Sequence, residues 1–185
     1  MLQFPPIPSW DALHPLIIHF PIALLLIVPL FVVAALIVSP ERSRLFMISA
    51  LFMMVLGTAS VYFAVGTGKA AGELVPEGRQ QLTAMLERHE HLAEETQVTF
   101  TILTLLLAGI VLVPSIFKVQ RARRLVVIAS MVFLAIYFGP AMLLVNTAHH
   151  GGLLVHHFGV TAKSAVTQVG PAIPGQQVGA ETARD

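Results

Sequence analysis

The sequence predicts an all-α protein, a four-helix bundle that spans a membrane. Of its 185 residues, 56% are hydrophobic and 11% are charged, whereas soluble domains carry about 25% charged residues. Four apolar runs are long enough to cross a hydrocarbon core of about 30 Å, which takes about 20 helical residues. No Asp, Glu, Lys or Arg lies in the middle of any run, so all four are predicted to be transmembrane helices. The runs are residues 15–38, 45–65, 92–113 and 125–145.

The first run is too long for the apolar part of a signal peptide, and no Lys or Arg precedes it. We therefore expect it to remain in the protein as a transmembrane helix. His14 precedes a proline, which favours a position just before the helix proper. His19 lies about one turn inside the run, where Pro21 leaves the carbonyl of Ile17 without its helical donor.

The second run is expected to end at Gly66-Thr67-Gly68, a flexible exit. An extended outer loop is then expected from Gly66 to His91. From Leu82 onward, apolar residues recur at helical spacing, so the third helix is predicted to begin outside the bilayer, near residues 76–77. His89 falls on the apolar face of this helix. His91 lies about 200° around the helix from it and is predicted to be solvated.

The fourth run contains Gly139-Pro140, which predicts a kink, and is expected to end at Gly151-Gly152. The short apolar stretch of residues 153–160 is predicted to pack back onto the outer face. The tail is rich in Gly, Pro, Gln and Ala and is predicted to be disordered. The expected division is an outer N-terminal segment, a four-helix membrane domain and a disordered tail, at residues 1–11, 12–160 and 161–185.

Basic residues predict the orientation. They are concentrated in the connections that follow the first and third runs. The basic residues at the opposite side of the membrane are interspersed with glutamates. Since short basic loops stay cytoplasmic, both termini are predicted to lie outside, giving an N-out/C-out topology. The basic residues of these two connections are Arg42, Arg44, Lys118, Arg121, Arg123 and Arg124.

All eight histidines lie toward the outer ends of the runs. Imidazole is the commonest protein metal ligand and also binds haem iron. The chain has no cysteine, which excludes thiolate metal sites and covalent c-type haem. Its net charge of +1 gives no electrostatic footprint for nucleic acid. The histidines are His14, His19, His89, His91, His149, His150, His156 and His157.

Three of these histidines, His19, His89 and His149, come from three different helices at similar depth. Bundle sites are built from inward side chains, so these three are the preferred ligands, with His14 next. Three or four imidazoles can hold a divalent metal, and two can hold a b-type haem. Alternatively, His19 bonds to a freed carbonyl or a threonine, and His149 meets water at the interface. The roles of His150 and of residues 156–157 stay open.

The run LHPLIIHFPIAL at residues 13–24 resembles the opening of an uncharacterised bacterial membrane family, domain of unknown function 2231. The segment LERH at residues 86–89 and the segment HHGGLLV at residues 149–155 place His89 and His149 at the family's histidine positions. At Phe158 the chain departs from a histidine that relatives carry. The resemblance covers about residues 12–160 and implies four membrane helices. It also implies an association with redox proteins, because some relatives are fused to cytochrome c-like domains.

Together these features lead to one hypothesis and two alternatives. The hypothesis is a redox accessory subunit of the bacterial inner membrane that binds a b-type haem or a metal at its outer face. Its partner is expected to be a cytochrome or another redox membrane protein. One alternative is a non-enzymatic accessory protein without a cofactor. A transporter is disfavoured because no helix carries an acid or base at mid-depth. The sequence contains no catalytic constellation.

Overall fold

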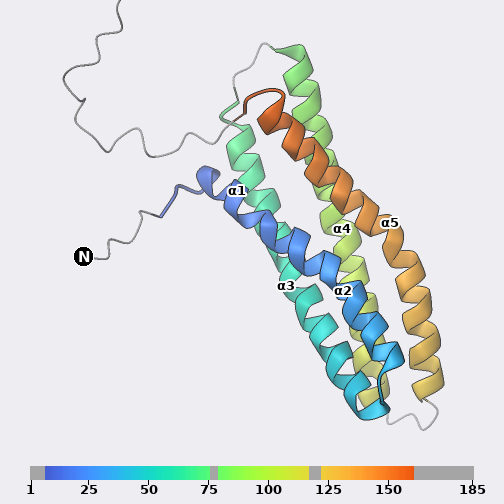
Figure 1. The fold of residues 1–185 in the computed structure, drawn as a ribbon. Coiled ribbons are helices and arrows are strands. Elements are labelled where there is room, and N and C mark those ends of the chain that lie inside the picture. The colour runs from blue at the N-terminus through green and yellow to red at the C-terminus, as the bar shows by residue number, and fades with distance from the viewer. Residues whose placement is uncertain (1–6, 76–78, 117–121, 161–185) are drawn as a thin grey trace, which may run out of the picture.

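The computed structural model describes residues 7–75, 79–116 and 122–160, which form a bundle of long helices (Figure 1). Within these ranges no strand is present, so the predicted all-α class is confirmed. Four helical stretches are long and apolar enough to cross a membrane. The elements are η1 (Asp11–Leu13), α1 (His14–Ile17), α2 (His19–Ile37), α3 (Pro40–Gly72), α4 (Gln80–Ile116) and α5 (Ala122–His156).

The helices pair as two hairpins. The chain of η1, α1 and α2 runs along α3, and α4 runs along α5 (Figure 1). At one end of the bundle, α2 turns into α3, and α4 finishes near the start of α5. At the other end lie α1, the end of α3, the start of α4 and the end of α5. The sites described below lie at this second end.

The first span is interrupted at Ile18, between α1 and α2. Pro21 has no N–H to donate to the carbonyl of Ile17, so the helical pattern is broken there. The next hydrogen bond, from Ile22 to the carbonyl of Ile18, is long at 3.5 Å. His14 is the first residue of α1, so the interruption separates His14 from His19.

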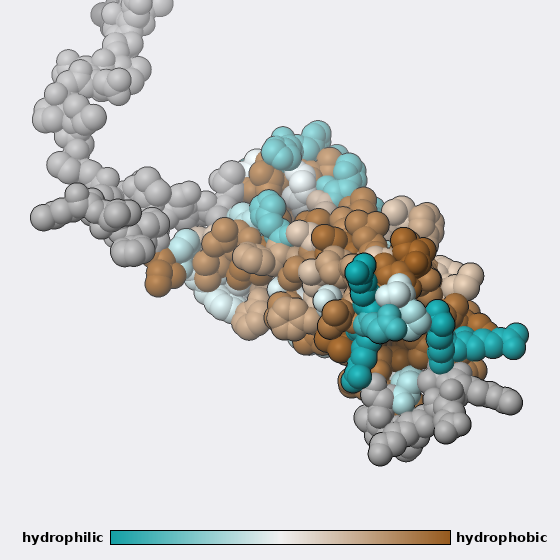
Figure 2. Space-filling model, turned by 60° about the horizontal axis from the view of Figure 1, so that its bottom comes forward, coloured by the Kyte–Doolittle hydropathy of each residue, from teal (hydrophilic) through white to brown (hydrophobic). Residues whose placement is uncertain are grey.

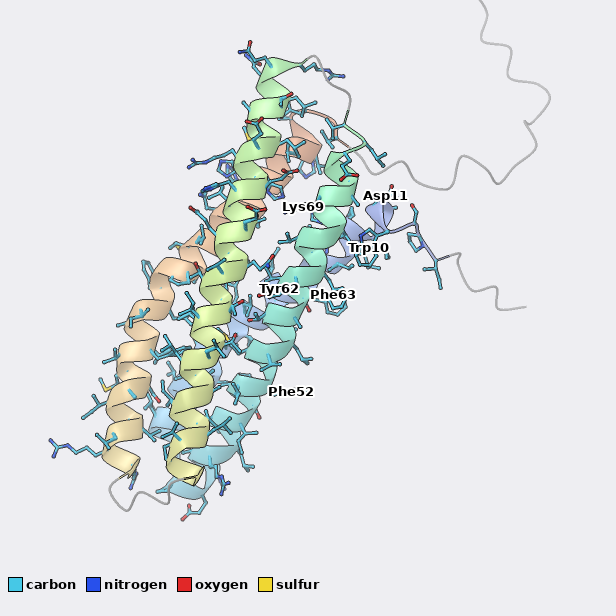
Figure 3. The ribbon with its side chains drawn as sticks, turned by 180° about the vertical axis from the view of Figure 1, so that it is seen from behind. Trp10, Asp11, Phe52, Tyr62, Phe63 and Lys69 are labelled. Carbon is cyan, nitrogen blue, oxygen red and sulfur yellow. The ribbon has the colours of Figure 1, made fainter. Side chains whose placement is uncertain are left out.

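Large apolar side chains are exposed along every long helix. Leu30, Phe52, Leu105 and Phe138 are each more than half exposed, and Phe52 points away from the bundle in Figure 3. Soluble monomers rarely expose continuous apolar surface on this scale, because water contact with it is unfavourable. Lipid removes that cost, so this surface agrees with a transmembrane bundle.

Hydrophilic side chains form a cluster at the end of the bundle where α3 and α5 begin, which Figure 2 brings forward, and others lie at the opposite end. Two arginines in the first turns of α3 and two in the first turn of α5 are exposed there. These are Arg42, Arg44, Arg123 and Arg124. The cationic end of the bundle is therefore opposite to the end where the chain enters α1.

The connection between α3 and α4 is shorter than the sequence predicted. The structure carries α3 through Gly66 and Gly68 to Gly72, and α4 begins at Gln80. The hydroxyl of Thr67 donates to the carbonyls of Phe63 and Ala64, so it folds back onto the helix. Lys-Ala-Ala follows, which favours helix. The expected loop from Gly66 to His91 is thus replaced by residues 73–79, of which 76–78 lie outside the described residues.

The predicted end of α5 was wrong. The helix continues through Gly151-Gly152 to His156 and is closed by Gly159, whose φ is +70°. The Val160 N–H donates to the carbonyl of Leu154 at 3.0 Å, as in a glycine-terminated helix end. Residues 153–160 therefore form the last turn of α5 and its cap, not a segment folded back. The predicted disordered tail, residues 161–185, lies outside the described residues.

Candidate functional site

A cavity of about 440 Å³ lies at the end of the bundle that holds α1, and residues of all five helices line it. Ligand pockets have volumes of about 300–1,000 Å³. The walls are mainly apolar, with Ile22, Val61 and Leu144 among them. Four imidazoles also line the cavity: those of His14, His19, His89 and His156.

The His14 ring is fixed against α3. Its Nδ1 lies 2.9 Å from the carbonyl oxygen of Ala64 and 3.2 Å from Oγ1 of Thr67. A carbonyl only accepts, so Nδ1 carries the proton and donates it. The Thr67 hydroxyl donates to α3 carbonyls, which leaves its oxygen free to accept from the ring. In this tautomer, the lone pair of His14 is on Nε2.

The His89 ring is fixed against α5 in the same manner. Its Nδ1 lies 3.1 Å from the carbonyl oxygen of Thr147, to which it donates. The Thr147 hydroxyl also contacts the Thr96 hydroxyl at 2.9 Å and donates to the Leu92 carbonyl at 3.2 Å. These bonds join α4 to α5 one to two helical turns after His89 along α4. The lone pair of His89 is again on Nε2.

The two rings lie close together in a T-shaped arrangement at the cavity. Their centroids are 6.5 Å apart, and their planes cross at 79°. Within the described residues, neither Nε2 has a hydrogen-bond partner. Both Nε2 atoms are accessible in the cavity, since the Ser130 hydroxyl is the one buried side-chain polar atom without a partner among the described residues. His14 and His89 therefore form a pair of fixed imidazoles that each offer one free lone pair.

The other predicted ligands lie elsewhere. His19 lines the same cavity, but its side chain is exposed at the start of α2. His149 is exposed on α5 and does not line the cavity. Its ring lies 5.9 Å from the ring of His150, which bonds to the Asn146 carbonyl. Ligand roles for His19 and His149 stay predictions.

The last three histidines also have defined positions. His91 is exposed and lies 3.4 Å from the carboxylate of Glu95, which confirms its predicted place on the solvated face. His156 is exposed at the edge of the cavity, and the His157 ring packs on Phe158. None of the three touches the His14–His89 pair in the contacts of the described chain.

The groups that line the cavity can be compared with those that hold a divalent metal or a haem. Across residues 7–75, 79–116 and 122–160, no group of three or more His, Cys, Asp or Glu side chains is placed to hold a metal ion. Protein zinc sites use at least three protein ligands, whereas haem iron takes two axial ligands. The paired imidazoles and the apolar walls fit the haem.

Charged side chains occur toward the edge of the cavity. Lys69 of α3 lines the cavity and forms a 2.7 Å ion pair with Glu94 of α4. Figure 3 views this side of the bundle, with Lys69 near α4. Both side chains are about half exposed, so the pair adds little stability. Asp11 and Glu90 complete the charged lining.

Fold and site together define an integral membrane protein with four spanning helices and a histidine-lined cavity at one end. The chain belongs to the family described as a predicted membrane protein, DUF2231, whose sequence profile matches residues 10–164. This confirms the resemblance seen in the histidine-containing segments. No curated protein and no solved structure matches the chain.

Proposed function

We propose that this protein is a redox accessory subunit of the bacterial inner membrane that binds one b-type haem between His14 and His89. The observation that carries the proposal is the pairing of two imidazoles from separate helices inside an apolar cavity. Histidines that bind metals typically donate their other ring N–H to a carbonyl or carboxylate. Both rings already make that bond, to Ala64 and Thr147.

The separation of the rings supports the same assignment. A metal–nitrogen bond is about 2 Å long, so two histidines that bind one ion must have their rings close together. The measured separation is 6.5 Å. The two rings are therefore close enough together to hold one iron.

When bound, the haem would supply one-electron chemistry. His14 and His89 would hold its iron, and apolar side chains such as Ile22 and Leu144 would exclude water from it. The partner in electron transfer is then a cytochrome or another redox membrane protein. The cationic end of the bundle favours a cytoplasmic position for that end and an outer position for the haem.

A cofactor-free accessory role is the second candidate, and one observation favours it. Each ring is already bonded through Nδ1 to a helix carbonyl, so the two histidines could serve only to join α1 to α3 and α4 to α5. A transporter gains no such support. Within the described part of the chain, no Asp, Glu, Lys, Arg or His is among the buried residues.

The test is the absorbance spectrum of protein purified in detergent from haem-replete cells, before and after dithionite, with total metal analysis. We expect reduced b-type haem bands in the wild type and in the control His91→Ala, whose side chain is exposed. His14→Ala and His89→Ala should lose them. A wild type that lacks these bands, and does not gain them on titration with haemin, would contradict the proposal and favour the cofactor-free role.

A further inference from the structure

Two glycines, Gly68 of α3 and Gly151 of α5, lie directly against the paired rings. A Cβ atom placed on Gly68 would be 2.9 Å from Cε1 of His14, and one on Gly151 would be 3.0 Å from Cε1 of His89. Carbon atoms in favourable contact are about 3.5–4.0 Å apart. A side chain at either glycine would therefore displace the neighbouring ring or the helix that carries it.

Both glycines occupy the same position relative to a ring's hydrogen bond. In α3 the His14 ring bonds to the carbonyl of Ala64, four residues before Gly68. In α5 the other ring bonds to the carbonyl of Thr147, four residues before Gly151. Residues four apart share one face of an α-helix. Each ring thus contacts a carbonyl at one turn of the helix and a glycine at the next.

Backbone conformation does not explain these two glycines. Among the described glycines, only Gly159 has a positive φ. Glycine inside a helix is destabilising relative to alanine, so its presence needs another reason. The neighbouring Gly66 and Gly152 provide the comparison, since a Cβ on Gly66 would meet only Trp10, at 3.6 Å, and one on Gly152 would meet nothing within 4 Å.

We infer that Gly68 and Gly151 are positioning residues that set the separation of the His14 and His89 imidazoles. This inference rests on the proposed haem site. Each helical hairpin contains one histidine ring that contacts a carbonyl and a glycine of the other helix. The histidine lies near the start of the first helix of the hairpin, and the glycine lies near the end of the second. The two halves of the bundle thus supply one ligand each by the same construction.

The first test uses the full chain in detergent without haem, with ¹⁵N-labelled histidine. We expect Gly68→Ala to shift the ring signals of His14 and Gly151→Ala to shift those of His89. The controls Gly66→Ala and Gly152→Ala should leave both rings unchanged. If each variant gives the same histidine signals as its control, the glycines do not position the rings and the inference is overturned.

A second measurement covers variants that fold poorly. Gly151→Ala should lower the melting midpoint of the wild type, but not that of the His89→Ala protein, because the ring that it would strike is gone. An equal loss in both backgrounds overturns the inference. Gly68→Ala should behave in the same way with His14→Ala.

Haem titration separates this inference from the proposed function. In a wild type that binds haem, each of Gly68→Ala and Gly151→Ala should weaken binding about tenfold or more, as loss of a ligand's support does. Unchanged haem affinity in both variants overturns the role in the haem site. A wild type that binds no haem contradicts the proposed function, while the ring signals still decide whether the glycines position the histidines.

Discussion

The Tyr137 hydroxyl donates a 2.7 Å hydrogen bond to the backbone carbonyl of Leu25. Pro29 lies four residues after Leu25 in α2 and has no N–H, so this carbonyl lacks its usual helical donor. Tyr137 is only 2% exposed and packs against Phe100 and Phe133. A side chain of α5 therefore completes the hydrogen bonding of α2 and joins the two hairpins in the centre of the bundle.

Tyr137→Phe should destabilise the protein, because it leaves a buried carbonyl without a donor. The expected loss is about 1–3 kcal/mol in the free energy of unfolding, measured by denaturant titration in detergent micelles. Tyr62→Phe is the control, since its hydroxyl bonds to Thr101 on the exposed side of α3. Equal stability of Tyr137→Phe and the wild type would show that the carbonyl finds another donor.

Thr147→Val should weaken the join between α4 and α5 while keeping the carbonyl that holds His89. Its hydroxyl contacts Thr96 and the carbonyl of Leu92, and both threonines are buried. We expect a loss of about 1 kcal/mol in stability and weaker haem binding in the titration described above. Thr83→Val is the matched control, because that hydroxyl is exposed and bonds to the carbonyl of Arg79, one residue before α4. A Thr147→Val protein that matches this control in both measurements would rule out a role for the hydroxyl pair.

His19→Ala and His149→Ala should each retain the haem bands. His19 is exposed at the edge of the cavity, and His149 does not line it. The comparison is made with His89→Ala in the same reduced spectra. Loss of the bands in either variant would restore that residue as a ligand and require α2 or α5 to rearrange around the haem.

The sequence was sufficient for the helices and for the positions of His89 and His91 around α4, for physical reasons. Long apolar runs have one stable form in lipid, so the four spans followed from composition. Helical phase placed His89 on the inward face and His91 outside. His19, His89 and His149 do not lie together in one cluster. The depth of a residue along a helix does not give the rotation of that helix in the bundle. Only the structure brings His14 to His89, through the break at Ile18.

The supporting residues carried weaker signals. Gly68 was interpreted as a flexible exit and Gly151 as a helix end, since glycine most often serves those purposes. Both lie inside helices, where a ring from another element contacts them. Ala64 and Thr147 contribute backbone carbonyls, which no side-chain pattern reveals. The sequence offered one indication of these supporting residues, which was a glycine at the same depth in the bundle as a histidine.

The orientation can be tested directly, because the chain contains no cysteine. Glu73→Cys places an exposed thiol beyond the end of α3, near the histidine cavity, and Arg124→Cys places one at the cationic end. With arginine-rich ends kept cytoplasmic, a membrane-impermeant maleimide should label Glu73→Cys in intact spheroplasts and Arg124→Cys only after the membrane is opened. The cysteine-free parent reports background labelling. The reverse pattern would place the histidines inside and contradict the proposed outer haem.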